Sequence, residues 1–85
     1  MNINDIKYEV NWKPLEKLAE KHGYFLVIDL GDFMYMGTIG TINLYKHRIT
    51  RNYINIDNND NCYKYNDGQY VTLKTTQAIY NVLEG

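Results

Sequence analysis

From Tyr24 onward the chain consists of short runs rich in β-branched and aromatic residues, separated by glycine, asparagine or aspartate. Such runs favour β-strands because these side chains fit a pleated, half-buried surface, and the residues between them tolerate tight turns. We expect strands at residues 24–28, 33–36, 41–49, 52–57, 62–65 and 69–74. Residues 6–10 alternate polar and apolar side chains, which indicates a further short strand. Because the turns are short, successive strands are expected to form an antiparallel meander of about five strands.

Turn residues define where the predicted strands end. Gly31-Asp32 lies between two apolar runs and is typical of a type II′ hairpin turn. Gly37 and Gly40 are expected to interrupt the chain. Residues 58–61 and 66–68 are predicted turns, since Asn, Asp and Gly accept the left-handed conformation.

Two segments carry the spacing of an amphipathic helix. In the first, Pro14 suits the first helical position, Gly23 suits the stop, and an apolar stripe runs between them. In the second, Thr75 or Thr76 can cap the helix, and the apolar stripe runs to Leu83. The sequence therefore predicts helices over residues 14–22 and 76–83.

Residues 41–57 also fit a second interpretation. Their apolar positions recur three or four residues apart, as on one face of a helix: Ile42, Tyr45, Ile49, Tyr53 and Ile56. β-branched residues and asparagine are mediocre helix formers, which favours two strands. The helix stays open as the alternative.

These elements predict one α+β domain over residues 1–85, with both helices packed on one face of the sheet. A chain of 85 residues and 10.1 kDa has room for one domain. The residues expected to be buried together are Leu26, Ile28, Leu73, Ile79 and Leu83.

Composition excludes several classes of protein. The longest apolar run, residues 24–28, is far too short to span a membrane, and we expect no secretory signal and a cytoplasmic location. A net charge of −1 argues against a generally basic nucleic-acid binder. The single cysteine, Cys62, cannot form an internal disulfide or frame a metal site alone.

The acidic tract at residues 57–61 has part of the spacing of a calcium loop. Asp57, Asn59 and Asn61 match the first, third and fifth ligand positions. Cys62 stands where the loop needs glycine for its sharp turn, and Gly68 stands where it needs a bidentate glutamate. We therefore predict an ordinary turn, no metal site and no cofactor.

A basic segment is the first candidate binding site. Lys46, Arg48 and Arg51 are flanked by Tyr45 and Tyr53, and cations interleaved with aromatic rings can hold phosphates and stack bases. The alternative is a solvated strand pair whose charges are paired across the strands.

Tyrosine is the second candidate feature. The chain has nine tyrosines, more than a thin core should need. On the predicted strands Tyr63 and Tyr65 share a face, and Tyr70 follows after the next turn. Tyrosines dominate binding hot spots because they offer large contact area at little cost in rotamer entropy. The open alternative is that they complete a small core, with their hydroxyls at its rim.

The sequence predicts a small non-enzymatic binding protein. It contains no serine, which removes serine-based triads, and its spacing places no histidine beside Cys62. Small size and residues with AT-rich codons suit an accessory or anti-defence inhibitor of a phage or mobile element, acting in the host cytoplasm. The expected partner is a host protein or a small anion such as a nucleotide. The alternatives are a nucleic-acid-binding module and, less favoured, an enzyme with its site at an oligomer interface.

Self-association is also expected. Two short helices can cover one face of a five-stranded sheet and little of the other, which leaves the tyrosines of the uncovered face without neighbours. A two-fold dimer would bury such a face, and a foreign protein partner is the competing occupant.

Overall fold

The computed structural model describes residues 11–21 and 29–84. The elements are α1 (Lys13–Lys21), the 3₁₀ helix η3 (Leu30–Asp32), β1 (Phe33–Ile39), β2 (Ile42–His47), β3 (Tyr53–Asp57), β4 (Cys62–Asn66), β5 (Gln69–Leu73) and α2 (Thr75–Leu83). The strands predicted at residues 6–10 and 24–28 lie outside the described residues, as do the predicted core residues Leu26 and Ile28.

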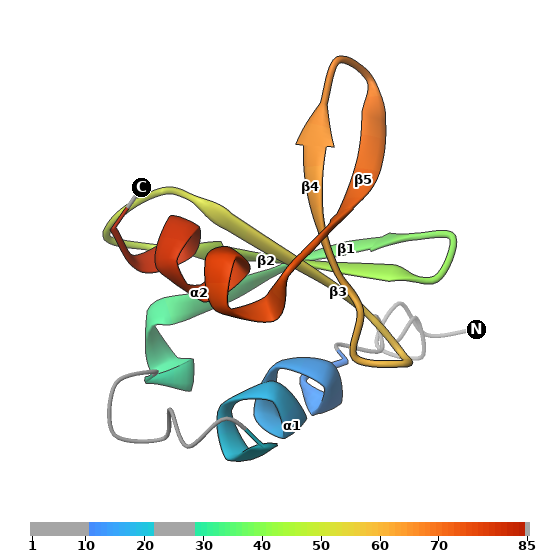
Figure 1. Cartoon of the computed structure of the whole chain (residues 1–85). Helices are drawn as coiled ribbons and strands as arrows, with labels where there is room; N and C mark the ends of the chain where they lie inside the picture. The colour runs from blue at the N-terminus through green and yellow to red at the C-terminus, as the bar shows by residue number, and fades with distance from the viewer. Residues whose placement is uncertain (1–10, 22–28, 85) are drawn as a thin grey trace, which may run out of the picture.

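The five strands form one antiparallel sheet in the order β1-β2-β3-β4-β5, which confirms the predicted α+β meander. The sheet is strongly twisted, and the β4–β5 hairpin rises steeply away from the other three strands (Figure 1). Helix α2 lies across the strands, and α1 lies below them (Figure 1). Side chains of both helices join the same buried cluster, so both helices pack on one face of the sheet, as predicted.

The buried cluster lies between this face and the two helices, and consists of Leu15, Leu18, Ala19, Phe33, Tyr45, Ile54, Ile56, Cys62, Ala78, Ile79 and Val82. Of the predicted core, Ile79 is buried, whereas Leu73 and Leu83 are only partly buried at the edge of the cluster. Alternation explains the β3 contribution, because Ile54 and Ile56 are two residues apart and point to the same face.

The predicted hairpin turn at Gly31-Asp32 is wrong. These residues belong to η3, in which the Asp29 side chain accepts a hydrogen bond of 2.9 Å from the Gly31 amide. A type II′ turn needs positive φ at its first central residue, and Gly31 is not among the described glycines with positive φ. The aspartate cap stabilises a helical turn instead.

Gly37 does not end its strand, contrary to expectation. β1 continues through it to Ile39, and the register with β2 shifts between Tyr35 and Gly37. The φ of Gly37 is +117°, an angle that other residues rarely adopt, so the glycine permits a β-bulge rather than a break. Gly40, at φ +62°, lies in the turn that follows.

Residues 41–57 form two strands, so the helical alternative is wrong. β2 and β3 pair in register from Ile42 opposite Asp57 to Lys46 opposite Tyr53. β2 ends at His47 rather than at residue 49, because the His47 ring Nδ1 accepts hydrogen bonds from the amides of Ile49 and Thr50 and closes the chain into a turn.

Both helices lie within one residue of their predicted bounds. The expected threonine cap of α2 is wrong, because Lys74 is the N-cap residue and makes no side-chain capping bond. Thr75 lies inside the helix, where its hydroxyl accepts a contact of 3.8 Å from the Cys62 thiol.

Candidate functional site

β3 and β4 part soon after they meet. They are paired only at Asn55 opposite Tyr63 and at Ile56 opposite Cys62, whereas β2 and β3 are paired at five positions. Beyond Tyr63 the β4–β5 hairpin leaves β3 and rises beside α2 (Figure 1). The fork between the strands opens a groove of about 440 Å³, within the size range of small-molecule sites.

We call this feature the tyrosine groove. It takes residues from four of the five strands and from α2: Leu44, Tyr53, Ile54, Asn55, Tyr63, Lys64, Tyr65, Tyr70, Leu73, Ala78 and Asn81. Tyrosine is its commonest residue, and most of the rest are apolar. A mostly apolar cleft with a few polar groups is the usual form of a ligand site.

The tyrosines of the groove come from both sides of the fork. Tyr53 belongs to β3 and is 43% exposed, and Tyr65 belongs to β4 and is 63% exposed. Tyr65 lies opposite Tyr70 in the β4–β5 hairpin, with ring centroids 5.1 Å apart and planes tilted by 55°. Aromatic surface is therefore available on both strands that border the opening.

Asn55 is the buried polar residue of the groove and is only 4% exposed. Its Nδ2 donates to the Tyr63 carbonyl oxygen at 3.2 Å, while its Oδ1 is buried and has no hydrogen-bond partner among the described residues. An unpaired buried acceptor costs about 1–3 kcal/mol, so such groups are rare in native proteins and each calls for an explanation. Because this oxygen is closed to solvent, a donor reaches it only when a lining side chain moves aside.

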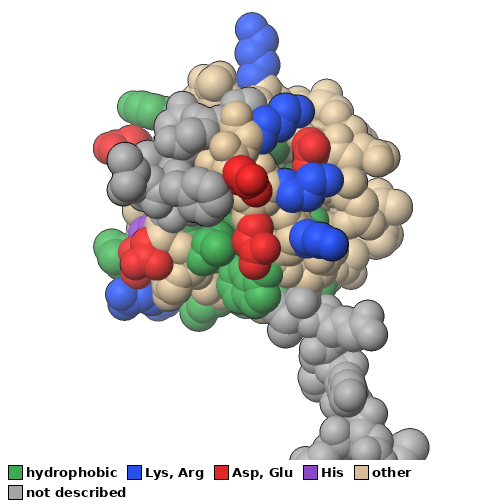
Figure 2. All heavy atoms as spheres, turned by 90° about the horizontal axis from the view of Figure 1, so that it is seen from below, with side chains coloured by type: hydrophobic (Ala, Val, Ile, Leu, Met, Phe, Trp, Pro, Cys, Tyr) green, Lys and Arg blue, Asp and Glu red, His purple; other side chains and the backbone are tan. Residues whose placement is uncertain are grey.

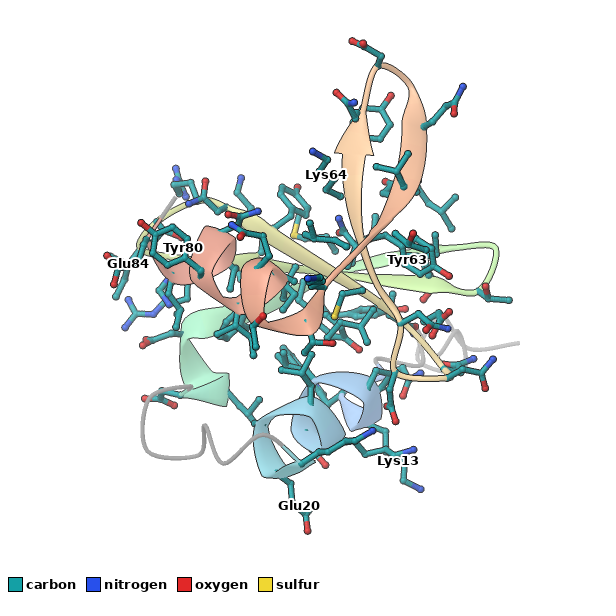
Figure 3. The ribbon with its side chains drawn as sticks, viewed as in Figure 1. Lys13, Glu20, Tyr63, Lys64, Tyr80 and Glu84 are labelled. Atoms are coloured by element: carbon teal, nitrogen blue, oxygen red, sulfur yellow. The ribbon has the colours of Figure 1, made fainter. Side chains whose placement is uncertain are left out.

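The charge in the groove is positive. Among the described residues that line the groove, the charged one is Lys64. Its side chain projects from β4 on the side opposite to Tyr63 (Figure 3). Lys64 and Tyr63 both reach the groove, because the groove runs through the gap between β4 and β3. A second cation lies next to it, with the Lys46 Nζ 5.7 Å from the Tyr53 ring centroid.

Asp57 supports the groove from behind Tyr63. Its buried carboxylate accepts hydrogen bonds from the Tyr63 hydroxyl at 2.8 Å and from the Asn61 side chain at 3.0 Å. Its other oxygen accepts the amides of Asn59 and Asn61. Burial by itself raises the pKa of Asp57, but these hydrogen bonds outweigh burial and lower the pKa below its ordinary value.

The tract at residues 57–61 is thus a turn whose key carboxylate is already bound by the chain's own donors. Asp60 in this turn adopts φ +68°. Across the described residues, no three His, Cys, Asp or Glu side chains group closely enough to hold a metal ion.

The structure brings together four of the sequence-predicted site residues, namely Tyr53, Tyr63, Tyr65 and Tyr70. Tyr45 is separated from them, because it is fully buried on the helix side of the sheet and its hydroxyl donates to the Asn11 carbonyl oxygen at 2.5 Å. Its ring is therefore not available to a partner.

The three predicted cations do not act as one cluster. Lys46 lies over Tyr53, whereas Arg48 forms an ion pair of 2.8 Å with Asp32, so its charge is already balanced. Arg51 is exposed in the turn before β3, with φ +68°.

Sequence reasoning missed Asn55, Lys64 and Asn81. Asn55 carried no distinctive signal, because a polar residue between Ile54 and Ile56 is what the alternation of a sheet covered on one face predicts. Lys64 lies between two predicted site residues, Tyr63 and Tyr65. Asn81 had no signal, because its place beside the groove depends on how α2 packs.

Two potentially reactive side chains lie in the core rather than in the groove. Burial raises the pKa of the Cys62 thiol, which keeps it protonated at neutral pH. His47 is buried, packs edge-on against Phe33 at 4.9 Å and uses its Nδ1 within the turn after β2.

The underside of the molecule, where α1 lies, carries both signs of charge. Acidic and basic side chains lie side by side on this surface (Figure 2). The exposed charged residues of α1 are Lys13, Glu16, Lys17, Glu20 and Lys21. Such mixed charge does not build the one-sided potential that attracts a polyanion.

None of the described helices is long and apolar enough to cross a membrane. Comparison of the chain with protein-family models, curated proteins and solved structures found no match.

Proposed function

We propose that this chain is a small non-enzymatic binding protein and that the tyrosine groove is its ligand site. The observation that carries the proposal is the buried Asn55 Oδ1, which lacks a hydrogen-bond partner among the described residues of a groove bordered by tyrosines. A ligand that donates a hydrogen bond to this oxygen would remove the cost of leaving it unpaired.

The shape of the groove favours a small ligand over a flat protein surface. Its volume of about 440 Å³ suits a compact molecule, and its exposed tyrosine rings suit a ligand with an aromatic ring. A protein that sequesters such a ligand from a host enzyme inhibits that enzyme without any catalytic group of its own. This mode of action agrees with the inhibitor role predicted from the sequence.

Titration followed by amide NMR tests the proposal. A set of small aromatic compounds bearing N–H donors is added to the ¹⁵N-labelled chain. We expect at least one compound to shift amide signals of β3, β4 and the part of α2 around Ala78 and Asn81 while leaving those of α1 unchanged. The proposal is wrong if no compound perturbs the groove, or if the shifts are confined to other surfaces.

A matched pair of variants distinguishes binding in the groove from nonspecific binding to exposed tyrosines. Tyr65 and Tyr80 are exposed to nearly the same extent, 63% and 60%, but only Tyr65 lines the groove, and Tyr80 projects from α2 well away from Lys64 (Figure 3). Tyr65→Ala is expected to weaken binding by about fivefold or more, the scale of one lost aromatic stacking contact. Tyr80→Ala should leave it unchanged, and equal effects would contradict the proposal.

A further inference from the structure

The tyrosine groove combines three recognition elements that a single class of ligand can use together. Aromatic rings border it on β3 and β4, the buried Asn55 Oδ1 is an acceptor without a partner among the described residues, and the Lys64 ammonium supplies positive charge. We infer that the ligand is a nucleotide, with its base in the groove and its phosphate at Lys64. This inference rests on the proposed function.

The base is suited to the tyrosines and to Asn55. Every nucleobase has a π-face, so stacking on tyrosine tolerates any of them. Each base also carries an N–H donor on its edge, either a ring N–H or an exocyclic amino group. Because the Asn55 Nδ2 is engaged by the Tyr63 carbonyl oxygen, the free position of this side chain is an acceptor and recognises such a donor.

The phosphate is suited to the charge around the groove. Lys64 is exposed, and Lys46 lies against the Tyr53 ring, so two cations border the tyrosines. The described lining residues include no carboxylate that would repel an anion. The carboxylate of Asp57, which contacts Tyr63, is buried and satisfied by the chain's own donors. An uncharged aromatic ligand would leave both ammonium groups unused.

Calorimetric titration with ribonucleoside monophosphates and the matching nucleosides tests this inference at low ionic strength. We expect a monophosphate to bind about five- to tenfold more tightly than its nucleoside. The advantage should shrink as salt is added, because exposed charges are screened. Lys64→Gln should remove most of the advantage of the monophosphate over its nucleoside.

Lys13→Gln is the matched control, because Lys13 is an exposed lysine on α1, far from Lys64 (Figure 3). The Lys13→Gln variant should still bind the monophosphate more tightly than the nucleoside, by the same factor as the wild type. Circular dichroism verifies that both variants are folded. If Lys64→Gln does not fold, Lys46→Gln provides a second test of whether positive charge beside the groove binds the phosphate.

The outcomes distinguish this inference from the proposed function. Equal affinity for nucleoside and monophosphate would overturn the phosphate assignment and leave the groove as a ligand site. The nucleotide assignment would also be wrong if an aromatic carboxylate such as indole-3-acetate bound more tightly than every nucleotide. If aromatic compounds shift the groove signals and no nucleotide binds, the inference alone fails. If nothing binds, the proposed function fails with it.

Discussion

Asn55 and Tyr63 lie opposite each other at the point where β3 and β4 part, and the Asn55 Nδ2 donates to the Tyr63 carbonyl oxygen at 3.2 Å. This bond joins the two strands at the base of the fork. It also determines the orientation of the amide, because the nitrogen must face the carbonyl and the oxygen is then the atom without a partner among the described residues. One hydrogen bond therefore joins the strands at the groove and leaves an acceptor as the atom that the proposed ligand would contact.

Replacing Asn55 should separate stability from binding. Asn55→Val loses the bond to Tyr63 but also removes the unpaired oxygen, and these two effects, each about 1 kcal/mol or more, oppose each other. We expect the free energy of unfolding to stay within about 1 kcal/mol of wild type in urea denaturation, while ligand affinity falls about tenfold. A large loss of stability would show that Asn55 is mainly structural.

Asp57 should make the fold sensitive to acid. Its folded-state pKa is lowered, so its contribution to stability is complete above the unfolded pKa of about 3.9 and is lost as pH falls through the folded value. Asp57→Asn places an amide nitrogen against donors and should cost about 1–3 kcal/mol at neutral pH. Denaturation at a series of pH values should show the gap between the two proteins closing below about pH 4. A difference in the free energy of unfolding that stays constant with pH would contradict the lowered pKa of Asp57.

Tyr45 should make the fold sensitive to alkali. Burial raises its pKa, and the neighbouring Tyr35 hydroxyl adds to the effect. The folded state therefore holds this proton more tightly than the unfolded state, whose tyrosine ionises near pH 10, and the stabilisation is lost as pH rises above that value. Tyr45→Phe loses the bond to the Asn11 carbonyl oxygen and should cost about 1 kcal/mol at pH 7. Thermal melts of both proteins should converge above about pH 10.

Cys62 should be dispensable for binding. It is 2% exposed and lies in the core, and burial raises the pKa of its thiol. Cys62→Ala should lower the free energy of unfolding by about 1–2 kcal/mol through lost packing, with ligand affinity unchanged. Loss of binding in a folded variant, measured by the same calorimetric titration, would point to a chemical role for the thiol.

The two-fold dimer remains a prediction, and the structure sharpens its test. We expect sedimentation at micromolar concentration to give twice the chain mass of 10.1 kDa. If the groove tyrosines serve a ligand, Tyr65→Ala keeps the wild-type mass. If that variant becomes a monomer instead, the same tyrosines form the contact between subunits, and the groove is not free for a ligand.

Local sequence patterns were sufficient for most elements of the fold. Pro14 and the apolar stripe that follows it place α1, because a helix is held by contacts between residues three and four apart. Asp67-Gly68 places the β4–β5 turn, where both residues adopt the left-handed conformation at φ 50° and 82°. The local pattern was wrong at Gly31 and Gly37, where a glycine suits a helical turn or a bulge as well as a hairpin or a break.

Only the tertiary structure decided which tyrosines line the groove. Tyr45 and Tyr53 flank the same basic segment, yet Tyr45 is fully buried and Tyr53 is 43% exposed. The register places Tyr45 opposite Ile54 on the face that both helices cover, and Tyr53 opposite Lys46 on the other face. The alternation of side chains can be read from the sequence. The face that receives the helices, and the point at which β3 and β4 stop pairing, depend on contacts between segments far apart in the chain.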